Sequence, residues 1–128
     1  MSASSSQGVR TADRTNNGIR EGAVTNSWFA AGIGQEWLMV DFAEQLNFNH
    51  IRIYQAANRI ANYRFEYSND GVNWTEFHSG NRIMEATPIH YAFTTPTTIQ
   101  ARYVRLFSEN SIGVTPIAVF EFEVYFLP

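Results

Sequence analysis

Hydrophobic and polar residues alternate along most of the chain after residue 35, which is the pattern of strands with one buried face. The alternation is clearest over residues 62–67, where Tyr63, Phe65 and Tyr67 occupy every second position. Further alternating runs span residues 35–42, 48–54, 101–107 and 119–126. No segment keeps a helical period for longer than a turn. The pattern therefore predicts an all-β fold.

The phase of the alternation predicts which side chains face the core. In the run over residues 35–42, we expect the ring of Trp37 to point inward and anchor the core. The last run has apolar side chains at every second position, and we expect all of them to point inward: Phe120, Phe122, Val124 and Phe126. Such a face is broad enough to join two sheets.

Turn-forming residues separate these runs. Residues 68–71 read Ser-Asn-Asp-Gly, and an Asp-Gly pair tolerates the positive φ of a tight hairpin. Several short strands separated by such turns predict a sandwich or a barrel. Residues 9–34 are polar and irregular, which is typical of a long functional loop. The serine-rich residues 1–8 are predicted to be a flexible leader, so that a single domain spans residues 9–128.

Composition narrows the possible functions. The chain has 128 residues, enough for one domain, with 45% hydrophobic and 15% aromatic residues. Its net charge of −3 argues against binding of nucleic acid, which needs a basic stripe. It has no cysteine, which excludes disulfides, thiolate nucleophiles and cysteine zinc sites. No apolar run is long enough to span a membrane, and we expect no membrane partner.

Signatures of catalysis are missing. Hydrolysis of a glycosidic bond usually needs two carboxylates facing one cleft, and the acidic residues lie mostly in predicted strands and turns. Glu121 and Glu123 share a strand face, but solvated or metal-bound carboxylates are the commoner use of such a pair. The histidines are isolated, and neither a nucleophile elbow nor a phosphate loop is present. We therefore expect a protein that is not an enzyme.

Three stretches of the chain, taken in order, resemble the discoidin or coagulation-factor type C domain, whose fold is shared by the family 32 carbohydrate-binding modules. The first comprises NNG at residues 16–18, SW at 27–28 and QEWLMVDF at 35–42. The second comprises FNHIRIY at 48–54 and NYRFEYSNDGVNW at 62–74, and the third ARYVRL at 101–106 and EFEVY at 121–125. The resemblance implies an eight-stranded, jelly-roll-like sandwich with mostly antiparallel strands.

For function, the resemblance implies a non-catalytic module that binds a glycan of the galactose, fucose or uronic-acid type through loops at one end of the sandwich. Sugar rings stack on aromatic side chains, and their hydroxyls bond to Arg, Asn, Gln and His. Three loops offer such groups, and the candidate ligand-binding residues are Trp28, Phe29, Gln55, Asn58, Arg59 and Asn110.

For several of these candidates, a role other than ligand binding is also open. Trp28 matches a partly structural position of the family, which makes Phe29 the better contact. The loop over residues 55–59 has no histidine, and Asn58 and Arg59 are expected to take its place; a solvated turn is the alternative. For Asn110, a contact with a sugar hydroxyl and a turn-forming role are equally open.

The family often carries one structural calcium ion, held by oxygen ligands. The matching metal-ligating positions here are Asn17, Thr25 and Glu121, with Asn17 standing where the family has an Asp. Loss of one carboxylate weakens a site for a hard cation. The alternative is therefore a loop closed by Asn17 without a metal.

The resemblance also implies a setting. We expect a monomeric module of a larger enzyme, a glycoside hydrolase or polysaccharide lyase, that is secreted or on the cell surface of a bacterium. One alternative is an adhesive discoidin domain that binds protein or lipid, although lipid-binding members use basic surroundings and this chain has no lysine. A structural spacer is the other alternative.

Overall fold

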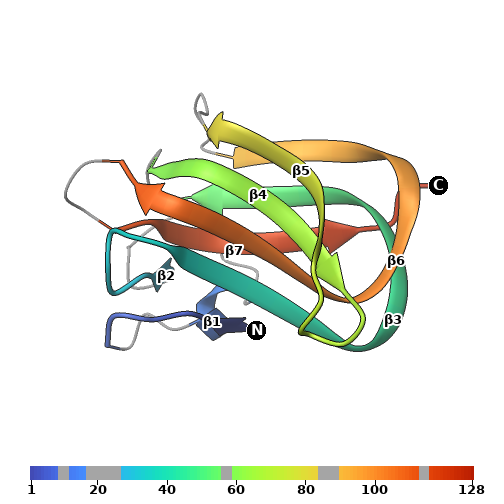
Figure 1. Cartoon of the computed structure of the whole chain (residues 1–128), viewed down its shortest axis with the longest axis horizontal. Helices are drawn as coiled ribbons and strands as arrows, with labels where there is room; N and C mark the ends of the chain where they lie inside the picture. Colours follow the sequence, from blue (N-terminus) through green and yellow to red (C-terminus); the bar gives the residue numbers. More distant parts are fainter. Residues whose placement is uncertain (9–11, 17–26, 56–58, 84–89, 113–115) are drawn as a thin grey trace.

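The computed structural model describes residues 1–8, 12–16, 27–55, 59–83, 90–112 and 116–128 (Figure 1). Its elements in chain order are β1 (Ser2–Ala3), η1 (Ala12–Asn16), β2 (Trp28–Phe29), β3 (Glu36–Gln55), β4 (Ile60–Ser68), β5 (Thr75–Arg82), β6 (His90–Ser111) and β7 (Ala118–Tyr125). The short 3-10 helix η1 is the single helical element of these described ranges. No helix in this part of the chain has the length and apolar character needed to cross a membrane.

Two long strands, β3 and β6, run through both layers of the molecule. The first part of β3 pairs with the second part of β6, as in the pair Leu38↔Leu106. Beyond the bends, the second part of β3 pairs with the first part of β6, as in Ile51↔Phe93. The register of this antiparallel pairing shifts where β3 bends from one layer into the other (Figure 1). The two strands therefore form a long hairpin-like ribbon that is folded over on itself.

The remaining strands complete two antiparallel layers. In one layer, β4 pairs with the second part of β6, β5 pairs with β4, and β1 pairs with the first part of β3. In the other layer, β7 pairs with the second part of β3, and β2 pairs with β7. The predicted all-β sandwich is confirmed. The described residues form seven strands rather than eight, and β3 and β6 each serve both layers as one continuous strand.

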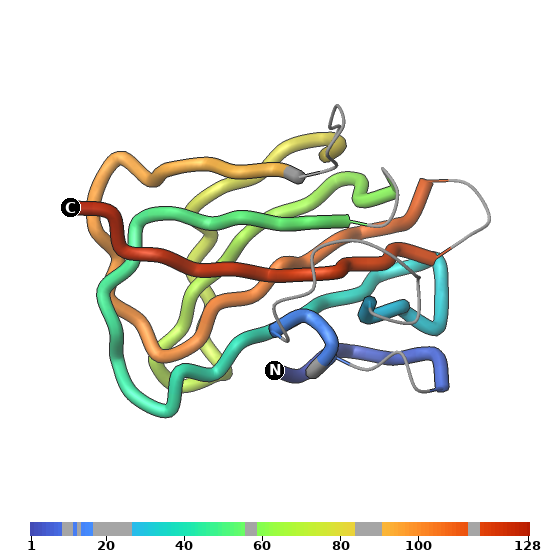
Figure 2. Tube along the Cα trace, turned by 180° about the vertical axis from the view of Figure 1, so that it is seen from behind, coloured from blue at the N-terminus to red at the C-terminus, as the bar shows by residue number. Residues whose placement is uncertain are grey.

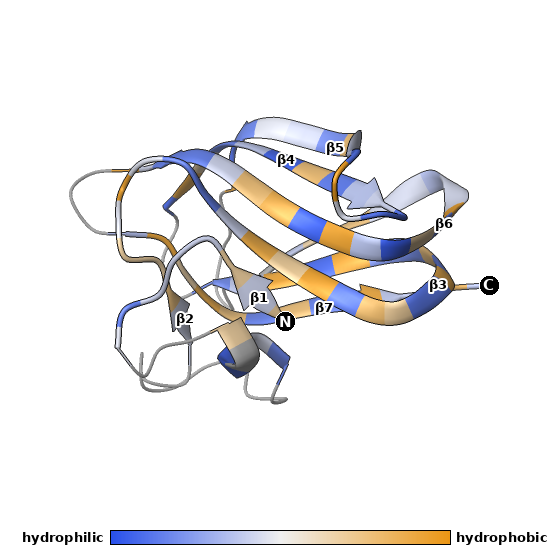
Figure 3. Cartoon of the chain, turned by 60° about the horizontal axis from the view of Figure 1, so that its bottom comes forward, coloured by the Kyte–Doolittle hydropathy of each residue, from blue (hydrophilic) through white to orange (hydrophobic). Residues whose placement is uncertain are grey.

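The core lies between the layers and is rich in aromatic rings. Phe65 of β4 is fully buried, and its ring centroid lies 5.0 Å from that of Phe93 in β6 and 6.2 Å from that of Phe122 in β7. Figure 3 shows apolar positions alternating with polar ones along β3 and β6. Truncation of a buried Phe to Ala costs about 3–5 kcal/mol. These ring contacts between strands of different layers therefore contribute much of the cohesion of the sandwich.

Trp37 does not anchor the core, contrary to the prediction. The next residue, Leu38, is fully buried, and Phe42 packs against the core on the same face of β3. Trp37 is half-buried on the opposite face, which it shares with the exposed Asp41. Alternation defines the two faces of a strand but not which one points inward. The face of Leu38 is apolar over residues 38–42, and the one carboxylate on it, that of Glu36, accepts hydrogen bonds from Ser4 and Ser5. Burial of the other face would bury the carboxylate of Asp41 within the strand.

A bulge changes the inward face predicted for the last strand. The pairing of β7 with β3 skips Phe120, which is the extra residue at a register shift. Phe122 belongs to the core as predicted, and Phe120 is buried at 7% exposed, but the core cluster between the layers contains Val119 and not Phe120. Phe126 lies beyond β7 and is 53% exposed, so its predicted inward position is also wrong.

Residues 1–8 differ from the flexible leader that their composition predicts. β1 pairs with β3, and the Ser4 amide donates to the Trp37 carbonyl at 3.0 Å. The Trp28 indole donates to the Ser5 carbonyl at 2.8 Å, and the Ser5 hydroxyl donates to the buried carboxylate of Glu36. Serine-rich segments are often mobile, but these hydroxyl and backbone groups satisfy buried polar atoms of the sandwich. The segment is therefore packed as part of the domain.

Candidate functional site

The described parts of the loops that were predicted to bind a ligand lie at one end of the sandwich. This is the end at which β4 begins, and β4 is nine residues long, so its other end lies about 27 Å away. The start of β4, the end of β6 and the segment between β2 and β3 lie together here (Figures 1 and 2). Backbone bonds connect them: Ile112 N donates to Arg59 O at 2.9 Å, and Ser111 N donates to Ile33 O at 2.9 Å.

Arg59 and Phe29 lie together at this end. The Arg59 guanidinium carbon lies 6.0 Å from the centroid of the Phe29 ring, and Nη1 donates to the Pro116 carbonyl at 3.2 Å. A single guanidinium thus contacts β2 and the segment before β7. Arginine has five N–H donors, and in the described part of the chain no other hydrogen bond of this side chain is recorded. Most of its donors are therefore available to a ligand.

Three of the predicted ligand contacts are buried: Phe29, which is 7% exposed, and Trp28 and Gln55, which are less exposed still. The Trp28 side chain is 0% exposed, because its ring belongs to the core and its indole N–H bonds to Ser5. Gln55 is 1% exposed, and its Nε2 donates to the Ile83 carbonyl at 3.4 Å. Neither side chain reaches the surface, so a contact of either with a ligand disagrees with the structure. The structural role considered for Trp28 agrees with its position.

Asn110 lies near the end of β6, half-buried, and is engaged with its neighbours. Its Oδ1 accepts from Asn62 Nδ2 at 3.0 Å, and its own Nδ2 donates to the Ser111 carbonyl at 3.2 Å. These bonds favour the turn-stabilising role over a free donor for a sugar hydroxyl. Asn58, the remaining predicted contact, lies outside the described residues.

Sequence reasoning missed Ile33. Its side chain is 47% exposed at the same end, in the loop after β2, and its carbonyl bonds to Ser111. An isolated apolar residue between two glycines has no periodicity that would single it out. Here it provides an apolar surface at the end of the sandwich that also holds Phe29 and Arg59, on segments that the backbone bonds connect.

A network of charged side chains borders this end on the outer face of β4 and β6. Glu109 accepts a hydrogen bond from Arg64 Nη1 at 2.8 Å and another from Gln35 Nε2 at 2.7 Å. These bonds, that of Arg64 first, hold the pKa of Glu109 below its ordinary value. Glu109 is therefore charged at neutral pH and neutralises Arg64. Within the described ranges, Arg59 is a cation of this end for which no ion pair is recorded.

The predicted calcium ligands are divided between described and undescribed residues. Glu121 lies in β7 and is 4% exposed, and η1 packs against β7. Asn17 and Thr25 lie outside the described residues. Among the residues that the structure does describe, no group of three or more His, Asp or Glu side chains is arranged to hold a metal ion. A carboxylate and backbone carbonyls are nonetheless the ligand types that calcium takes, and Glu121 fits such a set.

Comparison with known families identifies the domain type. The profile of the F5/8 type C domain matches residues 1–121, nearly the whole chain. The chain belongs to this family. The discoidin resemblance of the sequence motifs is thereby confirmed. A search of curated proteins finds no match to this F5/8 type C domain.

Solved structures that resemble this F5/8 type C domain include carbohydrate-binding modules. Chitosan-binding module 1 of a chitosanase/glucanase from Paenibacillus sp. IK-5 has a TM-score of 0.82 and 26% identity, covering 97% of this chain and 92% of that one. A pectin-binding module has a TM-score of 0.82 and 21% identity, with 99% and 89% coverage. A GH29 fucosidase from Ruminococcus gnavus has a TM-score of 0.81 and 19% identity, covering 98% of this chain but 24% of that one. The last two show a shared fold.

Proposed function

We propose that this F5/8 type C domain is a non-catalytic carbohydrate-binding module whose ligand site lies around Arg59. The observation that carries the proposal is the position of the Arg59 guanidinium, which contacts Phe29 and Pro116 and keeps most of its donors available. Planar donors of this kind suit vicinal sugar hydroxyls. The similarity to a chitosan-binding module at 26% identity supports the same reading.

The geometry favours recognition by hydrogen bonds over ring stacking. Phe29 is 7% exposed and lies under the Arg59 guanidinium, so little of its ring is open to a sugar. Ile33 offers the exposed apolar surface instead. A site with few aromatic contacts gives weak binding, and we expect dissociation constants between micromolar and millimolar. Asn58 remains a candidate contact within the same loop.

Replacement of Arg59 tests the proposal. A glycan array that contains galactose-, fucose- and uronic-acid-type glycans would first select a ligand, and isothermal titration would measure its affinity. We expect Arg59→Ala to weaken binding at least about tenfold, because a hydrogen bond to a charged group contributes about 1.5–3 kcal/mol. Arg59→Lys should recover only part of the affinity, since an ammonium lacks the planar fork.

The matched control is Arg52→Ala on β3, whose guanidinium contacts Tyr125 and His50 instead of the loop segments: its carbon lies 5.0 Å from the Tyr125 ring centroid, and its Nε donates to His50 Nε2 at 3.0 Å. Its affinity for the glycan should equal that of the unmodified domain. Thermal unfolding of each variant separates loss of the site from loss of the fold. A domain that binds no glycan at millimolar concentration, or an Arg59→Ala variant with unchanged affinity, would contradict the proposal.

We further propose that the domain is a monomeric module of a larger bacterial enzyme that is secreted or on the cell surface. The similar Paenibacillus module derives from a chitosanase/glucanase, and the similar fucosidase chain is about four times as long as the part that this chain covers. A catalytic glycoside hydrolase or polysaccharide lyase domain encoded in the same gene would support the proposal. A gene without any catalytic domain would count against it.

A structural calcium ion is a separate proposal, with Glu121 as the described ligand. Its carboxylate is nearly inaccessible in β7, against which η1 packs. Asn17 and Thr25 complete the expected set. When bound, calcium would supply a positive charge that fixes the long loop before β2, and it would take no part in a reaction.

Metal removal tests this proposal. After treatment with a chelator, addition of calcium at about a hundred times its dissociation constant should stabilise the domain by about 2.7 kcal/mol, which a thermal melt registers as a rise of several degrees. Glu121→Gln should abolish the rise. Magnesium serves as the control ion because it demands a smaller octahedral site. An identical melting temperature with chelator and with calcium would show that the loop is closed without a metal.

A further inference from the structure

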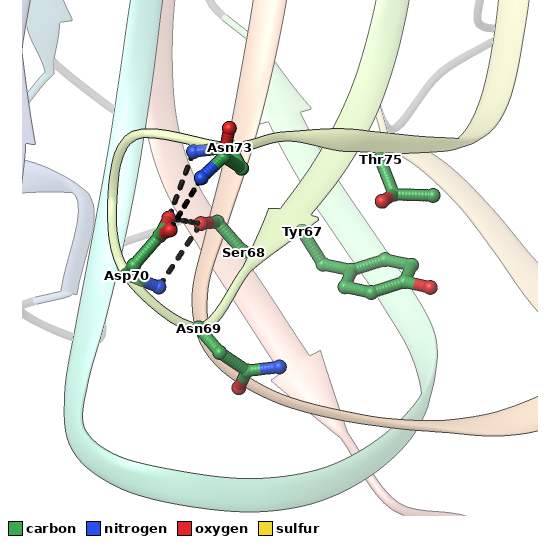
Figure 4. Close-up of a pocket in the computed structure, with 6 residues that line it drawn as sticks. All are labelled: Tyr67, Ser68, Asn69, Asp70, Asn73 and Thr75. Carbon is green, nitrogen blue, oxygen red and sulfur yellow. Dashed lines mark hydrogen bonds between the residues drawn. The ribbon is translucent and has the colours of Figure 1, made fainter.

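A hollow lies at the end of the sandwich opposite the loop site, where β4 turns into β5 (Figure 4). Its volume is about 300 Å³, at the lower limit of known small-molecule sites. Its lining residues are Tyr67, Ser68, Asn69, Asp70, Asn73 and Thr75. β4 spans the distance between this hollow and the loop site, so a ligand in one does not touch the other.

Three polar groups of the hollow have no recorded partner among the described residues: the hydroxyls of Tyr67 and Thr75 and the side-chain N–H groups of Asn69. Tyr67 and Thr75 are opposite each other in the β4–β5 pairing, so their side chains share one face. Figure 4 shows both side chains, with the amide nitrogen of Asn69, on the same side of the turn. The hollow thus presents one aromatic ring and several hydrogen-bonding groups together.

The amide of Asn69 is held in position. Its Oδ1 accepts from Gln45 Nε2 at 2.9 Å and from the Arg102 backbone amide at 3.2 Å. The oxygen is therefore occupied, and the nitrogen faces a ligand as a donor. A donor that is already oriented loses little conformational entropy when a ligand binds.

The turn itself is rigid and negatively charged. Asp70 Oδ1 accepts from the backbone amides of Val72 and Asn73, both at 2.8 Å, and Oδ2 accepts from Asn73 Nδ2 at 2.6 Å. These bonds, first those of the Asn73 and Val72 amides, hold the pKa of Asp70 far below its ordinary value. In the described part of the chain no ion pair neutralises Asp70. The hollow therefore keeps a negative charge at its edge.

We propose that this hollow is a second, weak binding site for a pyranose sugar without a carboxylate. The amide of Asn69 and the hydroxyls of Tyr67 and Thr75 bond to sugar hydroxyls, and the ring of Tyr67 contacts the C–H face of the sugar. The charge of Asp70 repels a uronate. The site does not depend on Arg59 or on the loops at the other end.

Removal of two hydroxyl groups tests the inference. Tyr67→Phe combined with Thr75→Val keeps the side-chain shapes and breaks no recorded hydrogen bond, so the fold is preserved. The probes are methyl β-D-glucopyranoside, methyl β-D-galactopyranoside and galacturonate, titrated into isotopically labelled protein and followed by NMR. We expect at least one of the two neutral glycosides to shift the signals of the Asn69 side chain and of the turn, and galacturonate to shift them much less. The double variant should bind that glycoside at least about fivefold more weakly.

The matched control is Thr98→Val, an exposed threonine in β6 outside the hollow, which should bind as the unmodified domain does. Signals of the turn that respond to neither glycoside would overturn the inference. An equal response to galacturonate, or an unchanged affinity in the double variant, would do the same. Arg59→Ala keeps the hollow intact, so loss of binding at the loop end with retained shifts at Asn69 would separate this site from the proposed function.

Discussion

The chain has nine arginines and no lysine, and several of the guanidinium groups lie on aromatic rings. The guanidinium carbon of Arg105 lies 4.0 Å from the Trp74 ring centroid, and that of Arg64 lies 3.9 Å from the Phe107 centroid. The carboxylate of Glu66 accepts from both, at 2.8 Å from Arg105 and 3.1 Å from Arg64. A planar guanidinium can stack on a ring and bond in its plane at once, which an ammonium cannot. The choice of arginine therefore has a structural use on this sheet.

His78 makes the stability of the domain depend on pH. Its ring stacks on Phe93 with centroids 3.7 Å apart, and its Nε2 lies 2.5 Å from the hydroxyl of Tyr91. Burial lowers the pKa of His78 in the folded state, so the unfolded chain binds a proton more readily. The neutral His78 ring contributes fully to the stability of the fold above the unfolded pKa of about 6.5. This contribution is lost as the pH falls from there toward the folded pKa. Urea unfolding at several pH values between about 7.5 and 5.5 should show falling stability.

The variant His78→Phe removes the titrating ring and retains a stack on Phe93. Its stability should fall less over the same pH range than that of the unmodified domain. Burial also lowers the pKa of His50, which faces Thr94 and Arg52, so a smaller dependence of the same sign should remain. An equal pH dependence in both proteins would show that His78 does not cause it.

Among the elements, we expect the short strand β1, with the residue Ser5 that follows it, to contribute more to stability than its length suggests. Ser5 follows it, and the hydroxyl of Ser5 donates to Glu36 while it accepts from the Ala31 amide at 2.9 Å. Ser5→Ala removes both bonds and leaves the Glu36 carboxylate, 8% exposed, with one partner fewer. We expect this change to lower the free energy of unfolding by about 1–3 kcal/mol, as measured by chemical denaturation.

The neighbouring Ser6 is the natural control, because no hydrogen bond of its hydroxyl is recorded among the described residues. Ser6→Ala should change the free energy of unfolding by less than about 0.5 kcal/mol. If Ser5→Ala were equally neutral, residues 1–8 would be only loosely attached, as their composition suggests.

The strands and the hairpin were predictable because their signals are local. The alternation around Phe65 and the Asp-Gly pair locate β4 and the turn that follows it, and Gly71 indeed has a φ of 75°. The inward side of Trp37 and the bulge at Phe120 were not predictable. Both depend on which strand lies opposite in the folded domain. The alternation of apolar and polar residues along one strand carries no information about its neighbours.

For the whole molecule, the sequence predicted the sandwich and the end at which its loops meet, but only part of the site. Arg59 lies against Phe29 at this end, whereas Phe29, Trp28 and Gln55 are all buried. All four stand in polar or loop-like contexts, and their burial is decided by contacts between residues far apart in the chain. The hollow beside Asn69 was also missed, because its residues are ordinary turn formers in sequence.

The continuity of β3 and β6 has a consequence for how the domain comes apart. Each strand contributes backbone to both layers, and pairs such as Glu36↔Ser108 join positions distant in the chain. We expect neither layer to unfold while the other stays intact, because the hydrogen-bonded pairing of β3 with β6 runs through both layers and would have to be interrupted at the bend. Slow hydrogen exchange should then belong to the molecule as one cooperative unit, and refolding should wait on the closure of these long loops.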